Sequence, residues 1–94
     1  MVMTISSEGA SKPVRLSVHA RQQIAFRGAT EAEPIEAIRN AKWEPAKKGR
    51  WECRLNLSFE ARRNEVFYRT KQVRPIFLEE DLEIVVVTVY VYYF

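Results

Sequence analysis

The spacing of hydrophobic positions changes near residue 50 of the chain. Before that point, apolar side chains recur every three to four residues, as they do on one face of a helix. After it, apolar and polar side chains alternate, as they do in a strand with one buried face. The pattern therefore predicts helices in the first half of the chain and a sheet in the second.

The first predicted helix covers residues 17–28. Ser17 is suited to the N-cap, and Gly28 is suited to the turn that ends the helix. Between them, Ala20 and Ile24 lie one turn apart and mark the buried face.

A second predicted helix follows at once. Thr30 and Glu33 have the spacing of a capping box. Pro34 is best tolerated in a first turn, so the helix is expected to begin at this capping box or a residue or two after its start. Its apolar positions share one face: Ala32, Ile35 and Ile38. Residues 41–49 end this helix and form a basic loop.

Four strands are predicted in the second half. They are expected at residues 51–59, 64–71, 73–79 and 82–92, with turns at 60–63 and 79–81. Pro75 has no N–H to donate, so it should limit pairing on one side of the third strand. The result is an α+β domain of the order ααββββ, in which an N-terminal helical pair packs on a four-stranded, mostly antiparallel sheet.

The last predicted strand is apolar on both faces, and such strands are usually covered on both. The helical pair can cover one face, and a partner chain could cover the other. The strand ends in the aromatic segment Tyr90–Phe94, which would promote aggregation if its edge stayed exposed. We therefore expect the C-terminal strand to be paired, either within the sheet or across a homodimer or partner interface.

The length of 94 residues leaves room for one domain, expected at residues 13–94 after a flexible arm at 1–12. The longest apolar run has about ten residues, whereas a membrane helix needs ~20, so no membrane span is expected. The N-terminus lacks the features of a signal peptide. The single cysteine, Cys53, permits no internal disulfide, and a reducing cytoplasm is the expected compartment.

The composition also restricts the chemistry. The chain has one His, one Asp and three Gly, and it has no glycine-rich phosphate loop. Neither a metal nor a nucleotide cofactor is therefore expected. The net charge is +3, but the segment 39–74 holds eleven basic and four acidic residues and carries +7. Such polarity allows one basic face to meet a polyanion, although a solvated sheet face with scattered cations would give the same count.

Several short motifs resemble an uncharacterised bacterial domain family. The matching residues are His19-Ala20-Arg21, Arg27-Gly28, Thr30, Glu33, the segment Arg74–Leu78, and Val87-Thr88-Val89-Tyr90. That family is similar to the RelE-like and BrnT-like toxins, in the fold group that includes barnase, EndoU and colicin nucleases. The resemblance implies a metal-independent endoribonuclease of the toxin–antitoxin kind, with RNA as substrate and an antitoxin as partner. The chain departs from the family at Gln23, Phe26 and Ala29, and Gln23 replaces a basic residue.

Cleavage of RNA without a metal needs a base for the 2′-OH proton, an acid for the leaving oxygen, and cations for the phosphorane. His19 is the one side chain that normally titrates near neutral pH. At ~100° per residue, Arg27 is turned ~80° from His19, so a site that uses both must be closed by the sheet. The predicted catalytic residues are His19, Arg27 and Tyr90. The predicted RNA contacts are Arg21, Lys47, Lys48, Arg50, Arg54 and Arg69.

A structural interpretation of the same residues remains open. His19 would then hold the helix on the sheet, and Arg27 would stabilise the C-terminal end of its helix. The protein would be a non-catalytic, dimeric interaction domain. A helix-turn-helix that binds DNA is disfavoured, because the second helix begins with three glutamates.

Overall fold

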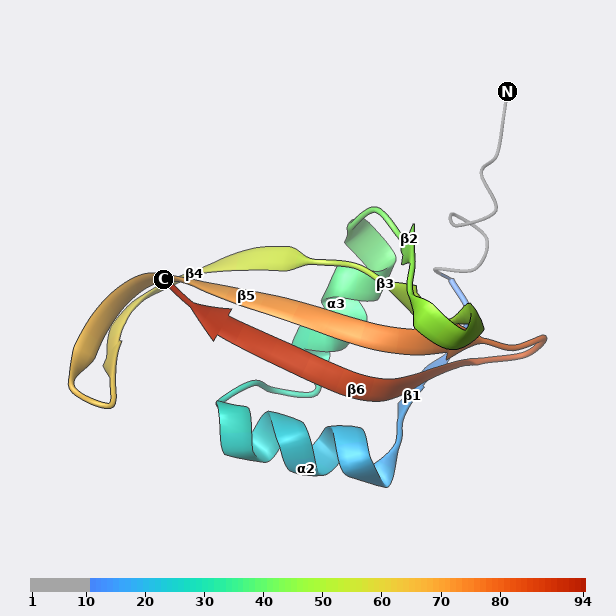
Figure 1. The fold of residues 1–94 in the computed structure, drawn as a ribbon, viewed down its shortest axis with the longest axis horizontal. Helices are drawn as coiled ribbons and strands as arrows, with labels where there is room; N and C mark the ends of the chain where they lie inside the picture. Colours follow the sequence, from blue (N-terminus) through green and yellow to red (C-terminus); the bar gives the residue numbers. More distant parts are fainter. Residues whose placement is uncertain (1–10) are drawn as a thin grey trace.

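The computed structural model describes residues 11–94, so most of the predicted N-terminal arm lies outside the described residues. Lys12, the last residue of that arm, forms an ion pair with Glu79 at 3.1 Å. The described chain is an α+β fold in which two helices pack on a mixed sheet of six strands (Figure 1).

The elements follow one another as β1 (Val14–Leu16), α2 (Val18–Arg27), α3 (Ala32–Asn40), β2 (Glu44–Pro45), the short 3₁₀ helix η1 (Lys47–Gly49), β3 (Trp51–Glu52), β4 (Leu55–Arg63), β5 (Val66–Glu79) and β6 (Ile84–Tyr93). The strand order in the sheet is β1-β6-β5-β3-β2, and β4 also pairs with β5. All pairs are antiparallel except β1 and β6.

The prediction of four strands in the order ααββββ was wrong in its count. One unforeseen strand, β1, precedes both helices and runs parallel to β6, with Val14 beside Ile84 and Leu16 beside Val86. Another, β2, is a two-residue strand in the predicted basic loop. Neither is long enough to show a period of two, and β1 depends on a partner about 70 residues away.

The second and third predicted strands are one continuous strand, β5. The turn predicted at 60–63 is also wrong, because β4 runs on to Arg63 and the chain reverses at Asn64 and Glu65. Both turn residues have positive φ, which suits the twist of a tight hairpin. The alternation in β4 breaks earlier, between Ser58 and Ala61, because a bulge there shifts the register without ending the strand.

Pro75 accounts for the break between β3 and β4. The last residue of β3, Glu52, pairs with Ile76, and the first residue of β4, Leu55, pairs with Val73. The two residues between them lie opposite Arg74 and Pro75. A proline cannot donate to a ladder, so the expected limit on pairing at this position is confirmed.

The predicted boundaries of the first helix are confirmed by its caps. The Ser17 hydroxyl accepts a hydrogen bond from the Ala20 N–H at 3.0 Å. Gly28 ends α2 in the left-handed conformation with φ 82°. Helix α3 begins at Ala32, and its N-cap is Glu31 and not Thr30. The Glu33 carboxylate accepts a hydrogen bond from the Thr30 N–H at 3.0 Å, but the expected capping box is not formed.

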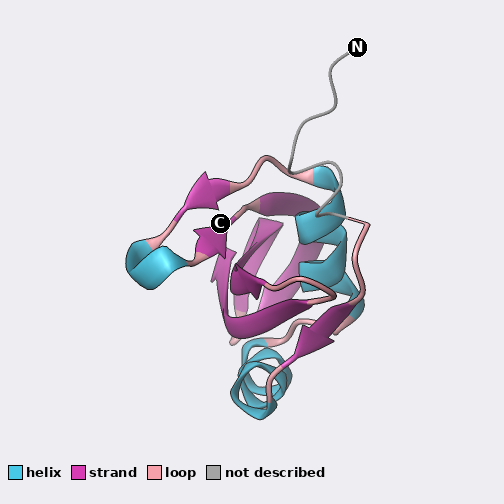
Figure 2. Cartoon of the chain, turned by 90° about the vertical axis from the view of Figure 1, so that its right-hand side faces the viewer, coloured by secondary structure: helices cyan, strands magenta, loops and turns pink. Residues whose placement is uncertain are grey.

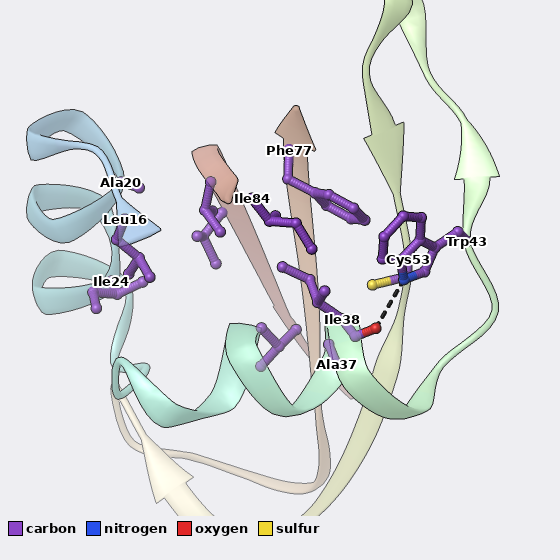
Figure 3. Close-up of a cluster of buried hydrophobic side chains, with 12 residues drawn as sticks. Leu16, Ala20, Ile24, Ala37, Ile38, Trp43, Cys53, Phe77 and Ile84 are labelled. Atoms are coloured by element: carbon purple, nitrogen blue, oxygen red, sulfur yellow. Dashed lines mark hydrogen bonds between the residues drawn. The ribbon is translucent and has the colours of Figure 1, made fainter. Parts of the chain in front are cut away.

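The hydrophobic core lies between the helices and one face of the sheet (Figure 3). Its buried members are Leu16, Ala20, Ile24, Ala37, Ile38, Trp43, Cys53, Val73, Phe77, Ile84, Val86 and Val89. Buried Lys71 is paired with Glu33 at 2.9 Å and so links β5 to the start of α3. Within residues 11–94, no helix has the length and apolar character needed to cross a membrane.

The opposite face of the sheet, called the outer face below, carries neither α2 nor α3. Figure 1 shows α3 behind the sheet and α2 along its lower edge, beneath β6. Figure 2 shows η1 and α3 on opposite sides of the sheet. The expected pairing of the C-terminal strand is met within the sheet, because β5 pairs with β6 along its whole length. The partner chain expected to cover the outer face stays a prediction.

Candidate functional site

A groove of about 800 Å³ lies on the outer face of the sheet. We call it the outer groove. It is lined by Pro45, Ala46, Lys47, Lys48, Arg50, Glu52, Arg74, Ile76, Thr88, Tyr90 and Tyr92. Four cations and one carboxylate therefore share this surface with two tyrosines.

A bulge in β6 places the tyrosines in the outer groove. Ile76 pairs with Thr88, whereas the next residue of β5, Phe77, pairs with Val86, so β6 has one extra residue there. The bulge inverts the alternation of the strand. Before it, Val86 faces the core, and after it Val89 does so, which directs Tyr90 to the outer face.

Arg74 is hydrogen-bonded on both sides within the outer groove. Its Nε donates to the Glu52 carboxylate at 2.6 Å, and its Nη2 forms an ion pair with the same oxygen. Its Nη1 donates to the Tyr92 hydroxyl at 3.4 Å. The hydrogen bond to Glu52 raises the pKa of Arg74 above its ordinary value, so the guanidinium stays charged. A carboxylate, a cation and a phenol are thus joined in one network.

The two tyrosines form an exposed aromatic platform. The rings of Tyr90 and Tyr92 stack with their centroids 6.4 Å apart and an interplanar angle of 18°. Their exposed fractions are 39% and 42%, so both rings can contact a ligand. The guanidinium carbons of Arg74 and Arg27 lie 5.6 and 5.5 Å from the Tyr90 centroid, which makes the platform cationic as well as aromatic.

The structure brings four of the sequence-predicted site residues together in the outer groove: Tyr90, Lys47, Lys48 and Arg50. Arg27 contacts the Tyr90 ring from α2, but its Nη1 donates to the backbone carbonyl of Val89 at 2.7 Å. Gln23, also on α2, accepts a hydrogen bond from the Val89 N–H at 2.8 Å. These two side chains satisfy both backbone groups that Val89 presents at the edge of β6.

Four other predicted residues lie outside the outer groove. His19 is exposed on the first turn of α2, and within the described chain it forms no hydrogen bond or ion pair. Arg21 is paired with Glu31 at 3.2 Å. Arg54 is exposed between β3 and β4, and Arg69 is exposed on β5.

The sequence prediction missed Glu52, Arg74 and Tyr92. The alternating pattern of the strand showed that Glu52 is a polar position, but it did not show that Arg74 is its partner. The three residues belong to three different strands, and only the registers of β3, β5 and β6 bring them together.

Among residues 11–94, no group of three or more His, Cys, Asp or Glu side chains is arranged to hold a metal ion. A search against protein-family models, curated proteins and solved structures finds no match to this chain.

Proposed function

We propose that the outer groove binds single-stranded RNA and cleaves it by metal-independent transesterification. The observation that carries this proposal is the network of Glu52, Arg74 and Tyr92 in a basic, aromatic groove. The same activity is implied by the resemblance to RelE-like and BrnT-like toxins. The antitoxin implied by that resemblance remains a prediction.

Each member of the network supplies one requirement of the reaction. Glu52 accepts the proton of the 2′-OH, whose oxygen attacks the adjacent phosphorus. Arg74 stabilises the negative charge that develops on the phosphorane. Tyr92 accepts a hydrogen bond from Arg74 and keeps its own proton, which it donates to the departing 5′-oxygen. The products are a 2′,3′-cyclic phosphate and a 5′-hydroxyl.

The remaining lining residues suit the binding of a single strand. Lys47, Lys48 and Arg50 stand at one rim of the outer groove and can contact phosphates. The Tyr90–Tyr92 platform can stack a splayed base, which is how proteins generally hold single-stranded RNA. This arrangement assigns Tyr90 to base stacking and Arg27 to positioning of the Tyr90 ring.

The proposal is tested by incubating a long RNA with purified protein in EDTA. The wild type is expected to leave cyclic phosphate ends. Glu52→Gln and Tyr92→Phe should each lower the rate by roughly 10²-fold or more, the usual effect of removing a general base or acid. Tyr68→Phe is the matched control, because Tyr68 does not line the outer groove and packs against Tyr93 instead.

His19→Ala separates this proposal from the site predicted from the sequence. His19 does not line the outer groove, so the variant should cleave at the wild-type rate. Loss of cleavage in His19→Ala with full activity in Glu52→Gln would overturn the proposed network. A folded wild type that binds RNA and leaves it intact would overturn cleavage and favour the non-catalytic interaction domain.

A further inference from the structure

We propose that the free edge of β4 is a dimer interface, on which a second copy of this chain adds its own β4 in antiparallel orientation. The inference is independent of the proposed function. Strand β4 has nine residues, spans ~30 Å, and hydrogen-bonds to β5 on one side only. Within the described residues, no backbone–backbone hydrogen bond reaches its other side.

The other edges of the sheet are short or already occupied. β1 has three residues, and β2 has two, one of which is Pro45. The part of β6 that extends past β1 lies against α2, where Gln23 and Arg27 occupy the backbone groups of Val89. The edge of β6 was the sequence-predicted partner surface, but β4 offers a longer and less obstructed edge.

The backbone groups of β4 that point outward can be assigned from the ladder. Thr70 exchanges backbone hydrogen bonds with Phe94, on the β6 side of β5. The next residue, Lys71, therefore points to the β4 side, where it pairs with Leu57. Leu57 is bonded inward as a result, and its neighbours Asn56 and Ser58 present their N–H and C=O groups outward.

Residues 55–59 have none of the features that usually protect an edge strand. They include no charged residue, no proline and no glycine, and the bulge of β4 begins only at Phe59, the last of them. The half-buried side chains Leu55, Leu57 and Phe59 alternate with the exposed side chains Asn56 and Ser58. A second strand with the same alternation can continue both faces of the sheet.

Charge selects the second copy as the occupant and sets the register. With the twofold axis at Leu57, Asn56 lies opposite Ser58 of the other copy. Just outside this ladder, exposed Arg54 precedes β4 and exposed Glu60 lies in the bulge, so the cation of one copy comes level with the carboxylate of the other. This ion pair forms twice because the contact is symmetric. If the register of the two β4 strands shifted by two residues in one direction, Arg54 would lie opposite Ser58. A shift in the other direction would bring Arg54 toward Arg62, so neither of these registers forms the ion pair. Within the described chain, neither Arg54 nor Glu60 has an ion-pair partner of its own.

Sedimentation over a range of protein concentrations tests the interface. The wild type is expected to dimerise reversibly, because five paired residues from each copy make a small contact. Arg54→Glu and Glu60→Arg should each weaken the dimer by roughly tenfold, since each opposes like charges at both ends of the interface. The double variant Arg54→Glu/Glu60→Arg restores both pairs and should dimerise as the wild type does.

Ser58→Pro gives a second test. It removes an outward N–H that β5 does not use, so it should abolish the dimer while circular dichroism and the thermal midpoint of the monomer stay close to wild type. A wild type that is monomeric at every concentration would overturn the inference. So would a dimer that persists unchanged in Arg54→Glu and Ser58→Pro, because that dimer must use another surface.

Discussion

The guanidinium of Arg27 shows how one side chain can stabilise an edge strand. Arg27 and Gln23 lie one turn apart on α2, and they bond the carbonyl and the N–H of the same residue, Val89. Together they replace the neighbouring strand that β6 lacks beyond β1. The basic residue expected at position 23 could not accept a hydrogen bond from an N–H, whereas the amide oxygen of Gln23 can.

Truncation of Arg27 should therefore lower stability. Arg27→Ala leaves the carbonyl of buried Val89 without its donor, so we expect a loss of about 1–3 kcal/mol in the free energy of unfolding, measured by urea denaturation. Arg21→Ala is the matched control on the same helix. Its ion pair with Glu31 is more than half exposed and should contribute less than ~1 kcal/mol. Equal losses in both variants would contradict the role assigned to Arg27.

Some of these residue roles follow from local patterns and some do not. The caps at Ser17 and Gly28 depend on neighbours within one helical turn, so the sequence was sufficient to predict them. The contact between Gln23 and Val89 joins residues 66 positions apart. The hydrophobic periodicity does not indicate a contact between such distant residues. From the sequence alone, a polar helical residue such as Gln23 is expected to face solvent.

The C-terminal end of α2 is held by side chains from three strands. The free carbonyl of Phe26 accepts from Arg63, that of Arg27 accepts from the Tyr93 hydroxyl, and that of Gly28 accepts from Lys71. Arg63 lies on β4, Lys71 on β5 and Tyr93 on β6. Two of them are cations, which suits the negative end of the helix dipole.

Because this helix end is crowded, two glycine substitutions are expected to lower the stability of the fold by different amounts. Gly28 and Gly49 both have positive φ, so alanine at either position should cost about 1–2 kcal/mol. A Cβ at Gly28 would also lie 2.7 Å from the Tyr93 hydroxyl, whereas one at Gly49 meets no atom within 4 Å. Gly28→Ala should therefore lower the thermal midpoint clearly more than Gly49→Ala, and equal shifts would contradict the close packing.

The limits of element prediction have a physical origin in the sheet. The alternation that predicted strands was correct, but two bulges, in β4 and in β6, change the face that each residue presents. A bulge sets two residues of one strand opposite one residue of its partner. It requires no particular residue type, so the hydrophobic pattern does not reveal it. Tyr90 became a candidate through the family resemblance. The network of Glu52, Arg74 and Tyr92 depends on the registers of three strands, which the hydrophobic pattern does not contain.

The reactivity of the Cys53 thiol reports on global unfolding. It is 1% exposed within the core. Burial, with a smaller contribution from the nearby Glu52 carboxylate, raises the pKa of its thiol from about 9 to about 12. The native thiol should resist alkylation at pH 8, while the urea-unfolded chain should react at once. Rapid labelling of the native protein would contradict this burial.

The same thiol makes stability depend on pH. Between pH 9 and 12 the folded state keeps a proton that the unfolded state loses, so the free energy of unfolding should fall as the pH rises. Urea titrations of wild type and Cys53→Ala separate this effect from the titration of tyrosines and lysines. The wild type should show the steeper decline, and parallel curves would exclude the contribution of Cys53.

The parallel pairing of β1 with β6 sets the order in which the chain can reach its final structure. Strand β1 and helix α2 are made first, yet their main partner β6 is made about 70 residues later. A helix of ten residues is marginal in water without tertiary contacts. During synthesis, α2 must therefore wait for the last strand, while the β4–β5 hairpin forms from neighbours. Elements that are made before β6 are thus secured only once β6 is complete.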